Sequence, residues 1–519
     1  MSLAASVSPT VATYLPGGLA FVTHFPYGCA EQTASSFLPN VAVAQLQGFD
    51  AFKIVSEDTL KTNIGGGLQR LYGFQRDDGG FGYWKESDRS YPYLSAYIVF
   101  AMQEAREAGY SVDQGVLDRA REYLQGVLRS GGSEPLNLAE RAYVLYVLAE
   151  GGGVDRGLLE NLFEKRADLP LFARAQLAMA FQKTAGNATS KRATALMEDI
   201  LTHVRIDPRG SYFAETESEP YRSIMHTDTR TTAIVLQAIV RIQPDHPVLP
   251  RVVRYLLAVR EDGHWDTTQS TSMSVLALVD YLKETGELDA DFTATIKIAG
   301  AEALRAEFGR ANNLSRATGN LLAADLQRGR DNAIEIAKAG KGTLYYDLLL
   351  SYFISAEKLP PIEQGMAVER TIAPVGNAPK DPAVGNTYKV TLTVTVPQDR
   401  HFVAVESPLP AGFEGVDLAL KTAQQNLYGE EFDGSRTGDL GDTSWWWGDW
   451  DPLRYFNHRE VRDDQIFLFA DELPAGVYTY EYLVRATTPG TYKLRPARAY
   501  EMYFPEVFGQ TAGEIVDVR

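Results

Sequence analysis

The apolar residues of this chain change their spacing near residue 286. Before that point, Ala139–Ala149 and Leu171–Lys183 place them three and four positions apart, which predicts helices with one buried face. After it, Phe292–Ile298 and Tyr388–Val396 alternate apolar and polar residues, the period of half-buried strands. The pattern predicts a multidomain chain in which an all-α layered domain precedes all-β modules.

The same spacing extends along both halves of the chain. It predicts further helices over Tyr93–Ala108, Thr231–Ile242 and Thr271–Leu282, and further strands over Leu344–Ile354, Gln465–Ala470 and Val477–Val484. Two glycine runs, at 65–67 and 151–153, fail the dinucleotide-binding pattern and are interpreted as loops. The turns at 76–81 and 260–265 resemble each other, because each runs through Asp-Gly to an aromatic residue. This similarity suits a toroid of helical hairpins with equivalent turns on one rim.

Domain boundaries are predicted from these changes and from the proline-rich junction Leu359-Pro360-Pro361. We expect residues 1–9 to be a leader and the end of a preceding β module, residues 10–285 the helical domain, and residues 286–358 and 359–519 two β modules. The first residues lack the regions of a signal peptide and read like a leader joined to the middle of a longer protein. The run 445–447 of three tryptophans is interpreted as a loop packed on its own domain, with an interaction surface as the alternative.

Charge and composition exclude several functions. The formal net charge of −17 opposes nucleic-acid binding and docking on anionic lipid, since both need clustered cations. No apolar stretch reaches the roughly 18 residues of a membrane span. The single cysteine, Cys29, can form neither an intramolecular disulfide nor a cysteine metal cluster, and we expect no metal and no cofactor.

The segment Pro26-Tyr27-Gly28-Cys29-Ala30-Glu31-Gln32 carries the strongest chemical signal. Pro26 and Gly28 precede a helical run, so Cys29 is predicted at a helix N-terminus. Residues three apart share a helix face, and the Cys29 sulfur can therefore meet the Gln32 carboxamide. Attack of the thiolate on the amide carbon, with loss of ammonia, forms an internal thioester.

Such a bond stores reactivity, because its leaving group is a thiolate with an ordinary pKa of about 8.5. Exposed N–H groups at the helix start lower a thiol pKa further. Any amine that reaches the Gln32 carbonyl forms a stable amide and frees Cys29, in one acyl transfer without turnover. Glu31 is either an orienting group or an exposed first-turn glutamate favoured by the helix dipole.

The chain resembles the alpha-2-macroglobulin and complement thioester proteins, whose signature is Pro-x-Gly-Cys-x-Glu-Gln. Ser35–Pro39 and the Asp-Gly turn before Trp84 resemble the bacterial alpha-2-macroglobulins, as do Thr268–Thr271 and Met502–Val507. The resemblance covers nearly the whole chain. It implies a helical toroid (α/α barrel, the thioester domain), the second part of a CUB-like β module, and a terminal macroglobulin-type β-sandwich.

The resemblance also implies a function, that of a broad-spectrum endopeptidase inhibitor and not an enzyme. In the family a protease cuts a bait region, and the exposed thioester then captures a protease lysine. The implied location is the periplasm or cell envelope, with a lipid anchor in some members and a role in evasion of host defence. Further implied properties are a monomeric state and a penicillin-binding-type peptidoglycan synthase as partner.

Two details of the site follow from the resemblance. Met502 and Tyr503 are expected to pack near Cys29, with Trp84 on the toroid side, and to keep water from the thioester. Complement proteins of the histidine type use an imidazole to reach hydroxyl acceptors, and this chain has no histidine between His24 and His203. Amines are therefore the expected acceptors, and His226 and His264 are the distant imidazoles to check.

Three other readings remain. His24 next to the motif could serve Cys29 as the base of a cysteine hydrolase, although a packed histidine is the simpler interpretation. Helical toroids also occur in terpenoid cyclases and prenyltransferase subunits, but their Asp-rich motif is not found in this sequence. The third reading is a passive binding module in which the thioester never forms.

Overall fold

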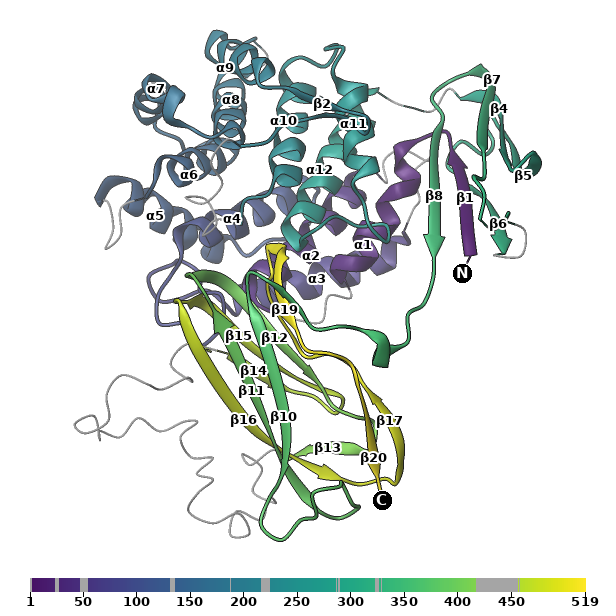
Figure 1. The fold of residues 1–519 in the computed structure, drawn as a ribbon. Helices are drawn as coiled ribbons and strands as arrows, with labels where there is room; N and C mark the ends of the chain where they lie inside the picture. Colours follow the sequence, from purple (N-terminus) through teal and green to yellow (C-terminus); the bar gives the residue numbers. More distant parts are fainter. Residues whose placement is uncertain are drawn as a thin grey trace. The chain divides into compact units, whose positions relative to one another are not determined.

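The computed structural model describes residues 2–23, 28–46, 55–130, 136–186, 188–215, 225–285, 287, 290–322, 326–327, 329–416, 456 and 458–519. The chain divides into two compact units, Met1–Tyr352 and Phe353–Arg519. The first unit holds all the long helices and two small sheets, and the second is built from strands (Figure 1).

Six helices form a closed inner ring in the first unit. Each packs on the next, and the last packs back on the first (Figure 1). Most of their residues are buried all round, as expected of helices enclosed by others. The inner helices are α2 (Ala30–Gln45), α4 (Pro92–Glu107), α6 (Leu138–Glu150), α8 (Leu171–Ala185), α10 (Asp228–Ile242) and α12 (Thr268–Thr285).

An outer helix packs on each inner one, which completes the α/α toroid. These helices bury one apolar stripe, such as Leu60, Ile64, Leu68 and Leu71 of the second. The predicted toroid is therefore confirmed. The outer helices are α1 (Leu15–Thr23), α3 (Glu57–Tyr72), α5 (Gln114–Ser130), α7 (Arg156–Glu164), α9 (Lys191–Thr202) and α11 (Leu249–Ala258); shorter elements are η1 (Val11–Tyr14), η2 (Arg166–Asp168) and the hairpin β2 (Arg205–Asp207) with β3 (Gly210–Tyr212).

The prediction of a loop at 65–67 was wrong, because all three glycines lie inside α3. Ser56 caps this helix, and its apolar stripe outweighs the weak helix propensity of glycine. A Cβ on Gly67 would lie 2.7 Å from Cδ2 of Phe37, so this glycine lets α3 approach α2 closely. The other run, 151–153, follows the end of α6 as a turn, as predicted.

The two similar Asp-Gly turns precede α4 and α12, and the second is the tighter of the two. Gln75 pairs with Phe81 in the first turn, and Glu261 pairs with His264 in the second. Gly79 and Gly263 adopt φ angles of 88° and 87°, a region that favours glycine. Both turns lie on the rim where the inner helices begin, as the sequence predicted.

Two three-stranded antiparallel sheets complete the first unit, with an apolar core that includes Val7, Phe292 and Ile296. One sheet places β1 (Ser2–Ser8) between β6 (Ala317–Leu322) and β8 (Tyr345–Ser351), and the other orders β5 (Ala301–Phe308), β4 (Asp291–Ile298) and β7 (Ile334–Lys341). The toroid is thus inserted in sequence between β1 and β4. Glu287 joins its two ends, since its carboxylate accepts hydrogen bonds from the Val11 N–H (3.1 Å) and the Tyr345 hydroxyl.

The second unit is a β-sandwich with a single apolar core. Along β11 every second residue is buried, which matches the predicted alternation. One sheet orders β10 (Ala367–Pro374), β11 (Thr387–Val396), β16 (Gly476–Ala486) and β13 (Phe413–Val416); the other orders β14 (His458–Val461), β15 (Gln465–Leu473), β12 (Arg400–Pro408), β18 (Arg498–Glu501), β19 (Phe504–Gln510) and β9 (Ile362–Gln364); η5 (Ala356–Lys358) and the pair β17 (Gly490–Leu494) and β20 (Glu514–Val518) flank them. The tryptophan run at 445–447 lies outside the described residues.

Candidate functional site

Cys29 is the N-cap residue of α2, and Gln32 is the third residue of that helix. The two residues cap each other. The Gln32 N–H donates to the Cys29 sulfur at 3.4 Å, and the Cys29 N–H donates to the Gln32 carboxamide oxygen at 3.3 Å. The structure therefore brings the thiol and the carboxamide together in one turn, and both side chains are buried.

The backbone around Cys29 is held on both sides. Ala30 donates its N–H to the Tyr83 carbonyl (2.8 Å), which anchors the turn before α4 against the start of α2. Thr33 bonds the Cys29 carbonyl through its N–H (2.9 Å) and its hydroxyl (2.8 Å). Cys29 thus has a fixed backbone at a helix N-terminus, where the dipole favours a thiolate.

Gly28 makes room for a cation beside the cysteine. A Cβ at position 28 would lie 2.7 Å from Nη2 of Arg70, so the guanidinium of α3 occupies the space that a larger residue would fill. Gly28 is the residue before Cys29, and a positive charge near a thiol favours its thiolate. Sequence reasoning missed Arg70, because nothing in its helix marks it. Pro26, Tyr27 and His24 lie outside the described residues.

Glu31 is fully buried, so the interpretation as an exposed first-turn glutamate was wrong. Its carboxylate accepts hydrogen bonds from the hydroxyls of Ser35 (2.6 Å) and Thr268 (3.2 Å). The Ser35 hydroxyl also bonds that of Tyr97 (2.9 Å), and burial raises the pKa of Tyr97 far above its usual range. The motif glutamate therefore begins a hydrogen-bonded chain that joins α2, α4 and α12.

A second polar group lies on the same end of the inner helices. The Arg230 guanidinium donates to the Tyr93 hydroxyl and lies 5.2 Å from the ring centre of Phe172. The Tyr93 hydroxyl donates to the Gln269 carboxamide oxygen (3.3 Å). Burial and the charge of Arg230 lower the pKa of His226 to about 3, so this imidazole is neutral near pH 7.

Both histidines singled out from the sequence have partners. The His226 ring stacks on Phe172 and its Nδ1 lies 3.3 Å from the Thr231 hydroxyl. The His264 ring stacks on Phe21 with 3.7 Å between ring centres, and its Nδ1 lies 2.8 Å from the Trp265 carbonyl oxygen.

The predicted shielding residues lie in different units. Trp84 is buried next to Tyr83, whose carbonyl anchors α2, and the Trp84 N–H donates to the Ser87 hydroxyl (3.0 Å). Met502 and Tyr503 belong to the second unit, where the Tyr503 ring packs edge-on against Phe402. A contact of Met502 and Tyr503 with Cys29 stays a prediction.

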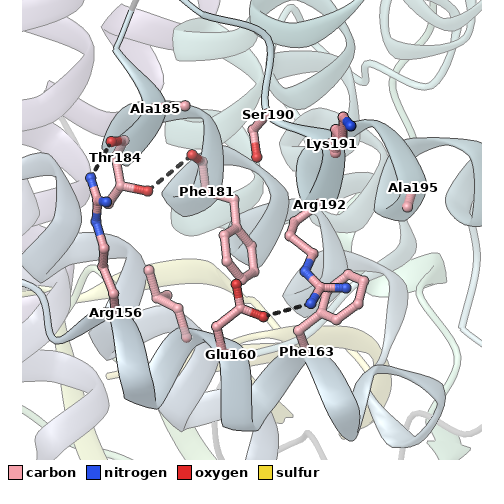
Figure 2. Close-up of a pocket in the computed structure, with 11 residues that line it drawn as sticks. Arg156, Glu160, Phe163, Phe181, Thr184, Ala185, Ser190, Lys191, Arg192 and Ala195 are labelled. Atoms are coloured by element: carbon pink, nitrogen blue, oxygen red, sulfur yellow. Dashed lines mark hydrogen bonds and ion pairs between the residues drawn. The ribbon is translucent and has the colours of Figure 1, made fainter.

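A concave feature lies away from Cys29. A hollow of about 400 Å³ lies between α7, α8 and α9, with Phe163 and Phe181 in its wall and Arg156 and Arg192 among its charged residues (Figure 2). It contains none of the residues near Cys29. Over the part of the chain that the structure describes, no cluster of three His, Cys, Asp or Glu residues could hold a metal, and no helix is long and apolar enough to span a membrane.

Comparison with known proteins gives a consistent picture. Residues 2–142 match the A-macroglobulin TED domain, and residues 365–506 match the bacterial alpha-2-macroglobulin MG10 domain. The chain is 27% identical over 470 residues to an alpha-2-macroglobulin homolog of Nostoc (86% of this chain, 23% of that protein). It is 26% identical over 507 residues to the alpha-2-macroglobulin of Escherichia coli (93% of this chain, 28% of that protein). The chain thus spans about a quarter of the length of these relatives.

Solved structures show the same fold. Native Escherichia coli alpha-2-macroglobulin from domain MG7 to the C-terminus superposes with a TM-score of 0.72 at 22% identity, covering all of this chain and 77% of that one. Salmonella alpha-2-macroglobulin reacted with methylamine gives a TM-score of 0.70 at 23% identity, covering all of this chain and 31% of that one.

Proposed function

This chain belongs to the bacterial alpha-2-macroglobulins and corresponds to their C-terminal region, and we propose that it performs the covalent step of protease trapping through a thioester between Cys29 and Gln32. The observation that carries the proposal is the reciprocal capping of these two residues at the start of α2. It holds nucleophile and carboxamide in one turn before any bond forms.

The chemistry has two steps. In the first, the Cys29 sulfur attacks the side-chain carbonyl carbon of Gln32, the C–N bond breaks, and ammonia leaves. In the second, a lysine amine attacks the same carbon, a new amide forms, and the Cys29 thiolate departs and takes up a proton. The helix N-terminus and the Arg70 guanidinium both stabilise the departing thiolate. Each molecule reacts once, so the chain is an inhibitor and not a turnover enzyme.

The wider role is part of the same proposal. We take the whole protein to be a broad-spectrum endopeptidase inhibitor of the periplasm or cell envelope, opened when a protease cuts a bait region. A lipid anchor, a monomeric state and an association with a penicillin-binding-type peptidoglycan synthase belong to this proposal. They rest on family resemblance.

The decisive experiment measures mass before and after amine treatment. A sample with the thioester is lighter than its sequence mass by one ammonia, carries no free thiol, and incorporates labelled methylamine at Gln32 as the thiol appears. Cys29→Ser is the control and should keep its full sequence mass. If an ammonia-deficient sample shows no label on Gln32 in a peptide map, the mechanism is wrong. If no sample is ever ammonia-deficient, the chain is a passive binding module.

Acceptor preference provides a second measurement. Burial lowers the pKa of His226 to about 3, which makes it a weak base, and its ring is stacked on Phe172. Amines are better nucleophiles than neutral hydroxyls and need no such base. Methylamine should therefore couple much faster than glycerol at equal concentration. Comparable rates would reveal a catalytic base.

The shielding residues are tested by hydrolysis. Replacing Met502 and Tyr503 together with alanine, or Trp84 alone, should shorten the lifetime of the thioester in water. An unchanged lifetime in the double variant would exclude the proposed contact between the last domain and Cys29.

A further inference from the structure

Arg230 is a buried arginine, and among the described residues no carboxylate forms an ion pair with it. Its side chain is 1% exposed, and no acidic oxygen of the described ranges lies within ion-pair distance. One nitrogen donates to the Tyr93 hydroxyl, while Nε and Nη1 have no hydrogen-bond partner. Fully buried arginines are nearly always paired, so this one needs an explanation.

A second unused donor lies nearby. The Tyr143 hydroxyl of α6 is buried and has no hydrogen-bond partner, and its ring centre lies 5.1 Å from that of Tyr93. Burial raises the pKa of Tyr143 well above its usual range, so it keeps its proton. Tyr93 lies between the two groups, because its hydroxyl accepts a hydrogen bond from Arg230 and its ring packs against that of Tyr143. Helices α4, α6 and α10 therefore meet where hydrogen-bond donors of Arg230 and Tyr143 have no acceptor among the described residues.

The aromatic neighbours satisfy only part of the guanidinium. The rings of Phe172 and Tyr93 attract the cation from distances of 5.2 and 5.7 Å. They offer no acceptor for the N–H groups that point along the guanidinium plane. An acceptor with one negative charge would satisfy these N–H groups and neutralise the cation. Burial lowers the pKa of His226 to about 3, so this imidazole adds no second positive charge beside Arg230.

We propose that the interior of the toroid binds a small monovalent anion, a halide or a short carboxylate, through Nε and Nη1 of Arg230 and the hydroxyl of Tyr143. The ligand would lie next to Tyr93, between α4, α6 and α10. This site is independent of the thioester chemistry and uses neither Cys29 nor Gln32.

The competing explanation is charge balance at a distance. Glu31 is also buried, and its charge acts on Tyr93, the residue that Arg230 contacts. If Glu31 alone neutralises Arg230, removing both charges should cost less than the sum of the single losses, and no added anion should matter.

The first test is thermal unfolding of the full chain in sodium chloride, sodium acetate and sodium gluconate at one ionic strength. Gluconate is too large for the interior and sets the baseline. Chloride or acetate should raise the Tm by about 4 °C in a saturable manner. Arg230→Met and Tyr143→Phe should reduce or abolish this increment. Arg174→Met is the matched control, because Arg174 pairs with Asp199 at 2.7 Å, and it should keep the increment.

The second test uses the wild-type chain and so does not depend on the folding of a variant. Crystals of the wild-type chain soaked in sodium bromide should show an anomalous peak at the Arg230 guanidinium. No peak together with equal Tm in all three salts overturns the proposal. Strong coupling between Glu31→Gln and Arg230→Met without any anion effect also overturns it and assigns the charge balance to Glu31.

Discussion

Charged side chains are stabilised differently at the two ends of the inner helices. At the end where the helices begin, Glu31 is held by hydroxyl groups, and Arg230 rests against aromatic rings. At the end where they finish, Arg241 pairs with Asp280 at 2.9 Å and with Glu150 at 3.3 Å.

The ion-paired end extends round the whole ring. Lys183 of α8 pairs with Glu150 at 2.7 Å, and Gln45 of α2 donates to Glu104 of α4 at 3.3 Å. Together with Arg241 and Asp280, these residues draw on all six inner helices. The two ends therefore differ in how charge is stabilised. Ion pairs close the ring at one end, whereas hydroxyl groups and aromatic rings surround the charged groups at the end that holds Cys29 and Gln32.

The largest effect is expected from breaking the charged end. Arg241→Met leaves Asp280 and Glu150 without their common cation and should lower the free energy of unfolding by about 2–3 kcal/mol. Arg192→Met is the control. Its pair with Glu160 (3.0 Å) is about half exposed on both sides, and it should cost less than about 1 kcal/mol. If urea unfolding shows the same loss of unfolding free energy for both variants, the ion pairs of Arg241 stabilise the chain no more than an exposed pair does.

Acidification should change the stability contributions of the two ends in opposite directions. The unfolded His226 takes up a proton below about pH 6.5, but the folded one, with its pKa lowered to about 3 by burial, does not. Its contribution to stability is therefore lost as pH falls through that window. Burial raises the pKa of Glu104 to about 7, so its contribution is lost as pH rises from about 4.5 to 7.

The two contributions oppose each other between about pH 4.5 and 6.5. His226→Gln should make the chain gain stability on acidification relative to wild type, and Glu104→Gln should make it lose more, each on the order of 2 kcal/mol. Urea unfolding at several pH values measures both. Parallel pH profiles for wild type and the two variants would contradict the assignment.

A smaller effect is expected at the end where the inner helices begin. Ser35→Ala removes a donor to Glu31 and a partner of Tyr97, both buried, and should cost about 1–2 kcal/mol of unfolding free energy. Ser274→Ala is the matched control, because Ser274 is equally buried and its hydroxyl has no hydrogen-bond partner. The control should be close to neutral. If both variants lose the same amount, the Glu31 chain does not hold this end together.

The smallest effect concerns α3, which packs outside α2. A Cβ at Gly66 meets nothing within 4 Å, so Gly66→Ala should stabilise the chain by about 0.5–1 kcal/mol. Gly67→Ala should fail to stabilise it, because its Cβ would lie 2.7 Å from Phe37. Thermal unfolding of the two variants measures the difference, and equal gains would show that α3 can move away from α2 at no cost.

Sequence reasoning worked where the signal was local. The apolar spacing of Ala139–Ala149 predicted a helix, and the three-residue spacing of Cys29 and Gln32 predicted that they share a turn. It failed at Gly65–Gly67, where an apolar stripe contributed by the flanking residues outweighed the propensity of the run itself.

The remainder of the site could not be predicted, because it depends on contacts between distant helices. Arg230 meets Tyr93, and Glu31 meets Thr268, only once the ring has closed. A glutamate in the first turn of a helix is usually exposed, so the burial of Glu31 required knowing that α12 packs on α2. Arg70 became recognisable only through the space that Gly28 leaves for it.

The central position of β1 determines the order in which the first unit can be assembled. During synthesis β1 leaves the ribosome before the toroid, yet both its partners, β6 and β8, emerge only after the entire toroid. Helical hairpins fold through nearby contacts, so the toroid can form while β1 is still waiting. Once it has formed, Glu287 at its end binds the N–H of Val11 at its beginning, and the two chain ends leave it side by side. The folded toroid thereby shortens the effective loop between β1 and its partner strands before the sheet forms. Pairing of β1 with β6 and β8 then has a small entropic cost.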